Sequence, residues 1–293
     1  MTARFEGERA HRFARAMART PGVRALEILS VLPLVWPAGP SSTTAVDLGC
    51  GPGYLSEVLE QLYPHVVRVD ESGDMMQCKA DPDHIISDLL TAARDLPPDT
   101  APDLIASLAT FHHVCKANDT ATDRSAGPSA GSDRVVDTVA SQRLQDAVIR
   151  AWAGRLRPGG RFVIVDVGWP RDPVSDRYAE SVVARFGGTG TVPWAELEAL
   201  DAKLPRYGLM SAVERFGLRS SAPGMSVSGL VDVLRKGLDV HRIGPIAFFD
   251  KVVAQYSLTG HDAHFFTEER LAASLAAAGL AEVTVGVVPT PWT

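Results

Sequence analysis

The sequence has 293 residues, enough for one large domain or for one core domain with a sizeable insertion. Hydrophobic residues make up 45% and charged residues 22%, a balance typical of globular proteins that argues against wholesale disorder. The formal net charge of −6 leaves no general basic surface. Since affinity for nucleic acid comes mainly from Lys and Arg, nucleic acid is not an expected partner.

Residues 1–43 are predicted to form a helical segment, broken at Pro21–Gly22. Glu6 and Glu8 lie among arginines and no early apolar stretch follows, so no signal peptide is expected. The most apolar stretch, Leu26–Trp36, is too short to span a bilayer, and we expect it to pack on the body of the protein instead of in a membrane. Three cysteines that form no metal-like pair indicate a reduced, cytoplasmic location.

From residue 44 onward, short apolar strands alternate with helices. A run of apolar residues at helical spacing begins soon after the first strand: Leu55, Val58, Leu59 and Leu62. A second helical pattern covers Val135–Leu156. The predicted strands are Thr44–Leu48, Val66–Val69, His84–Ile86, Asp103–Ala109 and Phe162–Val167. This alternation predicts an α/β fold with a doubly wound, mostly parallel sheet.

The chain is expected to have four parts. Residues 1–43 form the helical segment and residues 44–168 the α/β core, with a flexible loop at Ala117–Asp133. Residues 169–265 contain several amphipathic pieces, and we expect an inserted helical cap over the carboxyl edge of the sheet, on the substrate side. Residues 266–293 add a helix that begins at Thr267, followed by a strand at Glu282–Val288.

The clearest motif is the stretch Asp47-Leu48-Gly49-Cys50-Gly51-Pro52-Gly53, which joins the first strand to its helix. Three glycines let the backbone turn tightly and let a ligand approach where a Cβ atom would clash. Open α/β sheets bind ligands at this edge, beyond the carboxyl ends of the strands. The spacing G-x-G-x-G differs from the G-x-G-x-x-G of dinucleotide sites, which argues against a nicotinamide dehydrogenase. A plain tight turn is the alternative.

Two aspartates follow the next strands of the predicted sheet. Asp70 ends the second strand, where a carboxylate can accept both hydroxyls of a ribose and would repel a 2′-phosphate. A solvated loop acid is the alternative for Asp70. Asp88 follows the third strand, where a carboxylate suits the exocyclic amine of a purine, and a helix N-cap is the alternative there.

Five motifs together resemble the class I S-adenosylmethionine-dependent methyltransferase family. They are Asp47 to Gly53, Asp70, Asp88-Leu89, Asp103 to Ser107 continuing through Phe111-His112-His113, and Leu156 to Phe162. The resemblance covers about residues 44 to 168 together with the last helix and strand. It implies a Rossmann-like fold and S-adenosyl-L-methionine as cofactor. The family's sheet usually finishes with two strands, whereas only one is expected here after Gly279.

The same resemblance implies a set of cofactor-binding residues. The three loop glycines would approach the methionyl part of the cofactor, and Asp70 would bind the ribose. Met75 or Met76 would flank the adenine, and Asp88 would read its amine. The full expected set is Asp47, Gly49, Cys50, Gly51, Gly53, Asp70, Ser72, Met75, Asp88, Leu89 and Ala109.

The candidate catalytic residues lie at the end of the fourth predicted strand. A sulfonium methyl group is already a strong electrophile, so the protein mainly has to hold an acceptor in line with it. His112 and His113 lie beside the expected methyl position and either could act as a base at neutral pH; packing against the cofactor pocket is the alternative. Three more histidines, in or near the cap, could face the substrate: His241, His261 and His264. The spacing of the last two does not support a metal site, and no metal is expected.

These observations favour a methyltransferase that acts on a small molecule, such as a secondary metabolite, held under the helical cap. Two alternatives stay open: a different reaction of S-adenosylmethionine, such as an intramolecular cyclisation, an elimination or a pericyclic reaction, and a non-catalytic partner protein with the same fold. No membrane partner is expected. The oligomeric state stays open, and the helical N-terminus could pair two copies as a homodimer or cover the cofactor.

Overall fold

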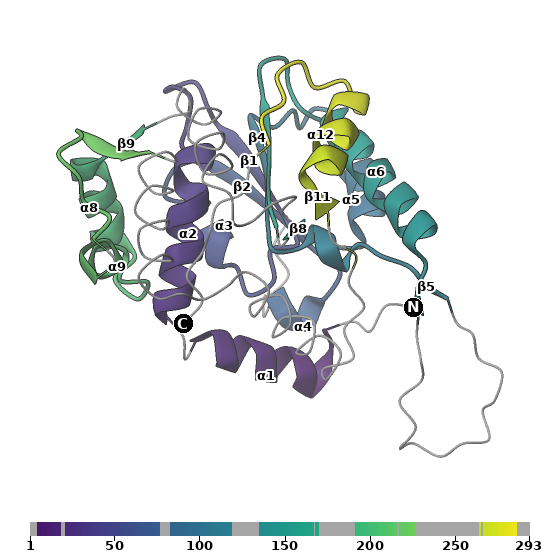
Figure 1. Cartoon of the computed structure of the whole chain (residues 1–293), viewed down its shortest axis with the longest axis horizontal. Coiled ribbons are helices and arrows are strands. Elements are labelled where there is room, and N and C mark those ends of the chain that lie inside the picture. Colours follow the sequence, from purple (N-terminus) through teal and green to yellow (C-terminus); the bar gives the residue numbers. More distant parts are fainter. Residues whose placement is uncertain are drawn as a thin grey trace.

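A five-stranded parallel sheet forms the centre of the chain, with helices on both faces (Figure 1). The structure is a computed structural model that describes residues 5–18, 21–76, 83–118, 135–166, 168–169, 191–215, 217–226, 264 and 266–285. The strands are β1 (Thr44–Leu48), β2 (His65–Asp70), β3 (His84–Ile86), β4 (Leu104–Leu108) and β7 (Arg161–Val165). Their order is β3-β2-β1-β4-β7, and every neighbouring pair is parallel. This order confirms the predicted doubly wound α/β fold.

The strand order reverses between β1 and β4, which are neighbours on either side of the switch point. At such a point, the connections leave the sheet toward opposite faces, and a crevice opens beyond the carboxyl ends of the strands. Three described segments meet there: the glycine-rich loop after β1, the short helix α4 (Gly73–Met76) after β2, and the 3-10 turn Phe111–His113 after β4. The candidate site is therefore built from these connections.

Alternation along β1 divides the core into two halves. Ala45 packs into a cluster with α2 (Pro21–Val35) and α3 (Tyr54–Leu59). Val46 and Leu48 pack on the opposite face, in a cluster with α5 (Leu89–Asp95), α6 (Thr138–Ala153) and α12 (Glu268–Ala277). Because strand side chains alternate between faces, Asp47 is directed to the same side as Ala45. A carboxyl group therefore enters the interior directly below the glycine-rich loop.

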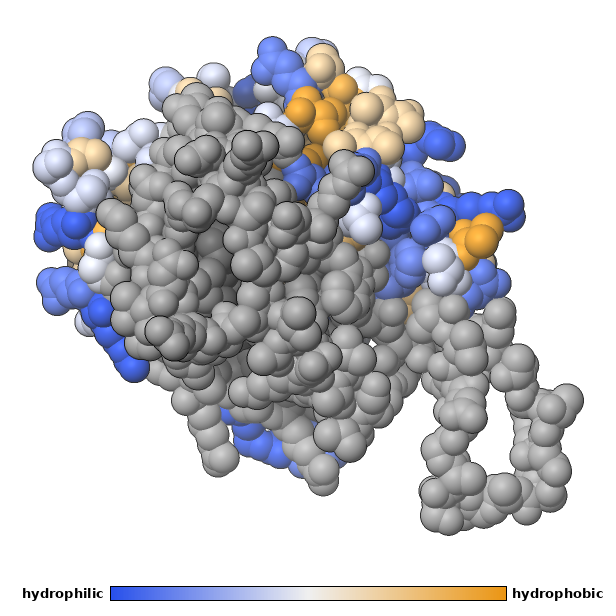
Figure 2. Space-filling model, viewed as in Figure 1, coloured by the Kyte–Doolittle hydropathy of each residue, from blue (hydrophilic) through white to orange (hydrophobic). Residues whose placement is uncertain are grey.

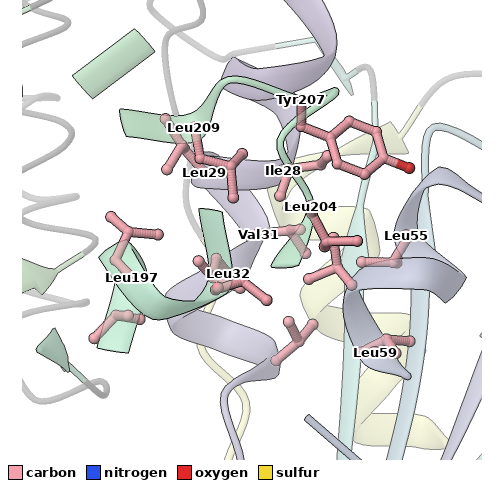
Figure 3. Packing of buried hydrophobic residues seen from close by; sticks show 14 of the residues in the cluster. Ile28, Leu29, Val31, Leu32, Leu55, Leu59, Leu197, Leu204, Tyr207 and Leu209 are labelled. Atoms are coloured by element: carbon pink, nitrogen blue, oxygen red, sulfur yellow. The ribbon is translucent and has the colours of Figure 1, made fainter. Parts of the chain in front are cut away.

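Helix α2 is buried on nearly every side. Its sequence from Ala25 to Val35 is almost entirely apolar, as expected for a helix enclosed in a core. The sheet and α3 cover one side, while α8 (Trp194–Lys203) and α9 (Leu209–Arg215) cover the other (Figure 3). The prediction that the apolar stretch Leu26–Trp36 packs on the body of the protein is confirmed. Among the described residues, no helix has the length and apolar character that crossing a membrane requires.

The described part of the expected cap lies beside α2. Strands β9 (Thr191–Pro193) and β10 (Gly224–Ser226) pair antiparallel next to α8 and α9. The side chains of α8 and α9 are drawn to α2 because α2 presents a second apolar face away from the sheet. Residues 191–226 therefore extend one face of the molecule and do not cover the carboxyl edge (Figure 1). Residues 170–190 and 227–263, where a cover was also predicted, lie outside the described residues.

The C-terminal helix returns to the core as expected. Thr267 caps α12 by accepting a hydrogen bond from the backbone N–H of Arg270, and Gly279 has the positive φ of 86° that suits a helix end. Strand β11 (Phe266–Thr267) pairs in parallel with β8 (Gly168–Trp169). Apolar residues gather near α12 on an otherwise mostly hydrophilic described surface (Figure 2).

Two sequence-based expectations are modified. Residues 282–285 are not a strand, and the rest of the expected strand Glu282–Val288 lies outside the described residues. The expected loop at Ala117–Asp133 starts with a short strand, β5 (Ala117–Asn118), that pairs antiparallel with β6 (Val135–Val136). Its middle, residues 119–134, is outside the described residues. The remaining helix, α1 (Gly7–Ala18), lies near α4 at the carboxyl edge (Figure 1).

Candidate functional site

The glycine-rich loop is held against the end of β2. The backbone N–H groups of Gly49 and Cys50 donate to the carbonyl oxygen of Val69, over 2.7 and 3.0 Å. Gly49, Gly51 and Gly53 have φ angles of 68°, 51° and 86°, in the region that side chains other than glycine rarely adopt. The predicted loop is therefore present, and its conformation explains why glycine occupies all three positions.

The turn after β4 contacts the glycine-rich loop. A Cβ atom at Gly49 would lie 2.1 Å from Cγ2 of Thr110, and the Thr110 hydroxyl donates to the Gly49 carbonyl oxygen over 3.1 Å. Ala109 has a φ of 55°, and within the described part of the chain it is the one residue other than glycine with a positive φ. Such a conformation costs about 1–2 kcal/mol for alanine. Strain of this kind concentrates at binding sites, which suits the expected place of Ala109 beside the cofactor.

Asp70 joins the glycine-rich loop to the end of β2. One carboxylate oxygen accepts from the backbone N–H of Gly51 and the other from that of Ser72, each over 2.8 Å. Burial raises the pKa of Asp70, although these N–H groups act in the opposite direction by stabilising the ionised form. Each oxygen has a second lone pair, so a carboxylate in this arrangement can still accept from ribose hydroxyls.

Asp47 lies beneath the loop and is 1% exposed. The hydroxyl of Ser56, on α3, donates to its carboxylate over 2.6 Å. Burial raises the pKa of Asp47 to about 7, against the lowering effects of the Ser56 hydrogen bond and the charge of Arg68, while the nearby Asp70 raises it further. Two carboxyl groups thus lie close to the glycine-rich loop, and burial raises the pKa of both.

The expected adenine side combines apolar and capping residues. Met75 and Met76 are buried, whereas Ile86 is 59% exposed at the end of β3, beside Asp70 in the sheet register. Ile86 was not among the expected cofactor-binding residues; it lies at the carboxyl end of the strand next to the one that ends in Asp70.

Asp88 and Leu89 have clear local roles. The Asp88 side chain caps α5 by accepting from the backbone N–H groups of Leu90 and Thr91, each over 3.0 Å. Leu89 is buried, and its carbonyl oxygen accepts from the indole N–H of Trp152 over 2.8 Å. The N-cap alternative for Asp88 is therefore present, and recognition of adenine by this residue stays a prediction.

His112 is paired with an aspartate that the sequence reasoning missed. Its backbone N–H donates to one oxygen of Asp166 over 2.9 Å, and its ring Nδ1 pairs with the other oxygen. The two side chains are 2% and 5% exposed. Asp166 directly follows β7, and β7 pairs with β4, so the parallel register brings residues 54 positions apart to the same edge. The available signal was an acid near the carboxyl end of the fifth predicted strand, Phe162–Val167.

A polar network fixes the turn that carries His112. The buried side chain of Gln145, on α6, donates to the carbonyl oxygens of Phe111 and His264, each over 2.9 Å. The backbone N–H of His264 donates to the His112 carbonyl oxygen over 2.8 Å. The guanidinium of Arg270, on α12, donates to Gln145 over 2.6 Å. His264 thus lies beside the candidate catalytic turn, while His241 and His261 lie outside the described residues.

The segment Phe5–Gly7 fastens the start of α1 to the same edge. The carbonyl oxygen of Phe5 accepts from the Ser72 hydroxyl, and the backbone N–H of Gly7 donates to the Asp74 carboxylate over 2.6 Å. The Phe5 ring meets the His113 ring edge-on, with 5.7 Å between centroids. The N-terminal segment therefore bridges the connections that follow β2 and β4, on either side of the glycine-rich loop.

Asp74→Ala is expected to loosen α1 without unfolding the core. Loss of the carboxylate removes a charge-assisted hydrogen bond worth about 1–3 kcal/mol. Amide hydrogen exchange over Gly7–Ala18 should accelerate at least several-fold, while exchange in β1 and β4 stays unchanged. Arg15→Ala is the matched control, because it removes only the exposed ion pair with Glu8. Equal exchange of α1 in both variants would contradict the proposed fastening.

No cluster of three or more His, Cys, Asp or Glu side chains suited to a metal ion occurs among the residues that the structure describes. The expectation that the protein needs no metal stays a prediction.

The sequence matches a family described as "Methyltransferase domain" over residues 46–125. This segment includes the glycine-rich loop, Asp70, Asp88 and the turn with His112. Residues 46–125 therefore match a methyltransferase domain, as the motifs predicted. No curated protein matches this sequence significantly.

Several solved structures, methyltransferases among them, resemble the chain at low identity. Streptomyces venezuelae DesVI is 15% identical, with a TM-score of 0.38, and the match covers 56% of this chain and 59% of that one. For the sugar N-methyltransferase KedS8 from a Streptoalloteichus species, the identity is 16%, the TM-score 0.35 and the coverage 60% and 58%. A methyltransferase from Archaeoglobus fulgidus is 17% identical, with a TM-score of 0.38, and the match covers 67% of this chain and 73% of that one. The chain thus spans less than two thirds of the first two of these proteins.

Proposed function

We propose that this chain, through the methyltransferase domain at residues 46–125, transfers a methyl group from S-adenosylmethionine to a small-molecule acceptor. The observation that carries the proposal is the glycine-rich loop with positive φ at three glycines, anchored to Asp70 at the switch point of the sheet.

The residues around the loop fit this cofactor in shape and in charge. The backbone of Gly49, Gly51 and Gly53 offers a side-chain-free surface for the methionyl part, and Asp70 offers carboxylate oxygens to the ribose. The exposed apolar surface of Ile86 suits one face of an adenine ring. The cofactor carries positive charge on its sulfonium and its amino group. Burial raises the pKa of Asp47 and of Asp70, and a bound cation would favour the ionised form of both carboxyl groups.

The chain's own part in the reaction is mainly orientation. When bound, the cofactor supplies the electrophilic methyl group. The loop and Asp70 would fix its position, and the turn Phe111–His113 would border the acceptor. Holding two reactants in line can lower a barrier by about 7–11 kcal/mol in good intramolecular models. A small acceptor is favoured over a polyanionic macromolecule because the net charge is −6.

Calorimetric titration tests the proposal first. The purified protein should bind S-adenosylmethionine and S-adenosylhomocysteine, but not NAD. Binding of NAD alone, or of none of the three, would overturn the cofactor assignment. Incubation with methyl-labelled cofactor then distinguishes transfer to an acceptor from cyclisation or elimination, because those reactions alter the cofactor and leave no labelled acceptor.

Asp70→Asn is expected to weaken S-adenosylmethionine binding by about 100-fold, since hydrogen bonds to charged groups contribute about 1.5–3 kcal/mol each. The amide also has only one acceptor oxygen for the N–H groups of Gly51 and Ser72, so the loop loses an anchor. The measurement is the dissociation constant by calorimetry. Asp99→Asn, which removes the same charge from an exposed site, should bind normally. Unchanged affinity in Asp70→Asn would remove Asp70 from the site.

A further inference from the structure

We propose that His112, positioned by Asp166, is a general base that removes the proton from a hydroxyl acceptor. The substrate is then an alcohol or a phenol. This inference rests on the proposed methyl transfer and specifies the atom that receives the methyl group.

Asp166 holds His112 at two points. One carboxylate oxygen accepts from the backbone N–H of His112 over 2.9 Å, and the other pairs with ring Nδ1. Because the carboxylate can only accept, Nδ1 carries the proton and the basic lone pair is on Nε2. The backbone contact fixes the position of the turn, while the ring contact fixes the tautomer. Asp166 therefore acts as a positioning residue for His112.

The burial of this pair is informative. The side chains of His112 and Asp166 are 2% and 5% exposed. A buried carboxylate destabilises the fold unless a partner group interacts with its charge. A neutral asparagine or serine could accept the backbone N–H of His112 equally well. What only a carboxylate adds is stabilisation of an imidazolium ring, the species that exists after the histidine has taken a proton.

Two further histidines and one arginine lie near His112 in the described part of the chain. The His113 ring lies 4.0 Å from that of His112, between centroids. Burial and the charge of Arg270 lower the pKa of His264, whose backbone donates to the His112 carbonyl oxygen. Arg270 lies behind Gln145, to which it donates. Asp166 is the acid that pairs with ring Nδ1, where a carboxylate can stabilise the imidazolium formed during proton transfer.

A histidine base of this kind has its largest effect on a hydroxyl acceptor. A neutral amine attacks with its own lone pair and loses its proton after the bond has formed, and a carboxylate has no proton to lose. A hydroxyl group is a poor nucleophile until its proton leaves. In the balanced step, the acceptor proton moves to Nε2 of His112 and the oxygen bonds the methyl carbon. The carbon–sulfur bond breaks, and sulfur keeps the electron pair as a thioether.

The ring is reached only if part of its cover moves, because so little of it is accessible. Phe5 contacts the ring of the neighbouring His113, so the Phe5–Gly7 segment lies next to the turn that carries His112. Exclusion of water in the closed state would protect the transferred methyl group from hydrolysis and strengthen the contact with Asp166.

The first test needs no acceptor. Nitrogen-15 NMR of histidine-labelled protein bound to S-adenosylhomocysteine reports the tautomer of each ring, and His112→Gln identifies the His112 signals. The expected result is a proton on Nδ1 in the parent protein and loss of that preference in Asp166→Asn. A ring protonated on Nε2 in the parent protein would overturn the proposal.

The second test is an acceptor screen with methyl-labelled S-adenosylmethionine and matched compounds: phenol against aniline frameworks, and sugar alcohols against amino sugars. Labelled ethers are expected from the hydroxyl compounds. His112→Gln should lower kcat by roughly 10²- to 10⁴-fold with the dissociation constant of the cofactor unchanged. Asp166→Asn should also lower kcat without altering the KM for the cofactor.

The outcomes separate the two proposals. Methylation of amines only, or full activity of His112→Gln on a hydroxyl acceptor, would overturn the base assignment and leave methyl transfer standing. Failure to bind S-adenosylmethionine would overturn the proposed function itself. Asp99→Asn serves as the control for loss of an exposed carboxylate elsewhere.

Discussion

Gly49→Ala is expected to lower the free energy of unfolding by about 2–5 kcal/mol and to abolish S-adenosylmethionine binding. Two costs combine at this residue. A φ of 68° costs alanine about 1–2 kcal/mol. In addition, the new Cβ atom would lie 2.1 Å from Cγ2 of Thr110, so the turn after β4 must move. Forced overpacking of this kind costs typically about 1–3 kcal/mol.

The matched control for this prediction is Gly159→Ala. Gly159 also has a positive φ, of 78°, but a Cβ atom there would meet nothing within 4 Å. It lies in the turn before β7, at the opposite end of the strands from the glycine-rich loop. Urea denaturation should therefore show a loss of only about 1–2 kcal/mol for Gly159→Ala, with normal cofactor binding. Equal stability losses for the two variants would show that the contact with Thr110 is unimportant.

Asp47→Asn is expected to stabilise the protein at pH 8 by about 4 kcal/mol and to weaken cofactor binding. Burial raises the pKa of Asp47 from 3.8 to about 7 in the folded protein. One pKa unit corresponds to about 1.4 kcal/mol, so keeping this carboxyl group ionised in the fold is costly. Asparagine has no charge to bury and retains an oxygen that can accept from Ser56.

The sign of the pH dependence follows from linkage. Below about pH 4 the carboxyl group is protonated in both states and has no effect. Between pH 4 and 7 the folded state holds the proton more tightly than the unfolded state, so stability falls as the pH rises; above pH 7 the loss is complete. The stabilisation by Asp47→Asn should therefore be about 2 kcal/mol at pH 5 and about 4 kcal/mol at pH 8.

Urea denaturation of both proteins at these two pH values measures the effect. Asp103→Asn provides a control of opposite sign. Burial alone would raise the pKa of Asp103, but the backbone N–H groups of Thr44 and Thr43 and the charge of Arg157 lower it overall. Asp103→Asn should therefore destabilise the protein at neutral pH, and this loss should shrink as the pH falls below 4. A pH-independent gain for Asp47→Asn would contradict the assigned role of Asp47.

Local patterns were enough to predict the sheet and the loop. The strands are short, apolar and separated by helices, so their existence and parallel direction follow from alternation along the chain. The three loop glycines are needed by the backbone itself, as their φ angles show, and this need is visible in the spacing. The same holds for Thr267, whose hydroxyl caps α12. These features depend on neighbours within a few residues.

Features that depend on distant residues could not be predicted in the same way. Asp166 contacts His112 only because β7 lies beside β4, and the sequence of neither strand shows which strand is its neighbour. Asp88 caps the N-terminus of α5, a local role. A contact with adenine would depend on where the ligand binds. The placement of residues 191–226 depends on the outer face of α2, which is far away in sequence.

The enclosure of α2 limits where the chain can be truncated and affects how it folds during synthesis. Its outer face is covered by α8 and α9, which are synthesised long after it. A nascent chain that already holds the whole sheet still exposes a row of leucines and valines, a surface that chaperones bind and that favours aggregation. A fragment ending at Trp169 would keep that exposed surface permanently. The segment 191–226 is thus an intrinsic partner of the N-terminal helix, and removing it would yield an insoluble protein in place of a minimal catalytic domain.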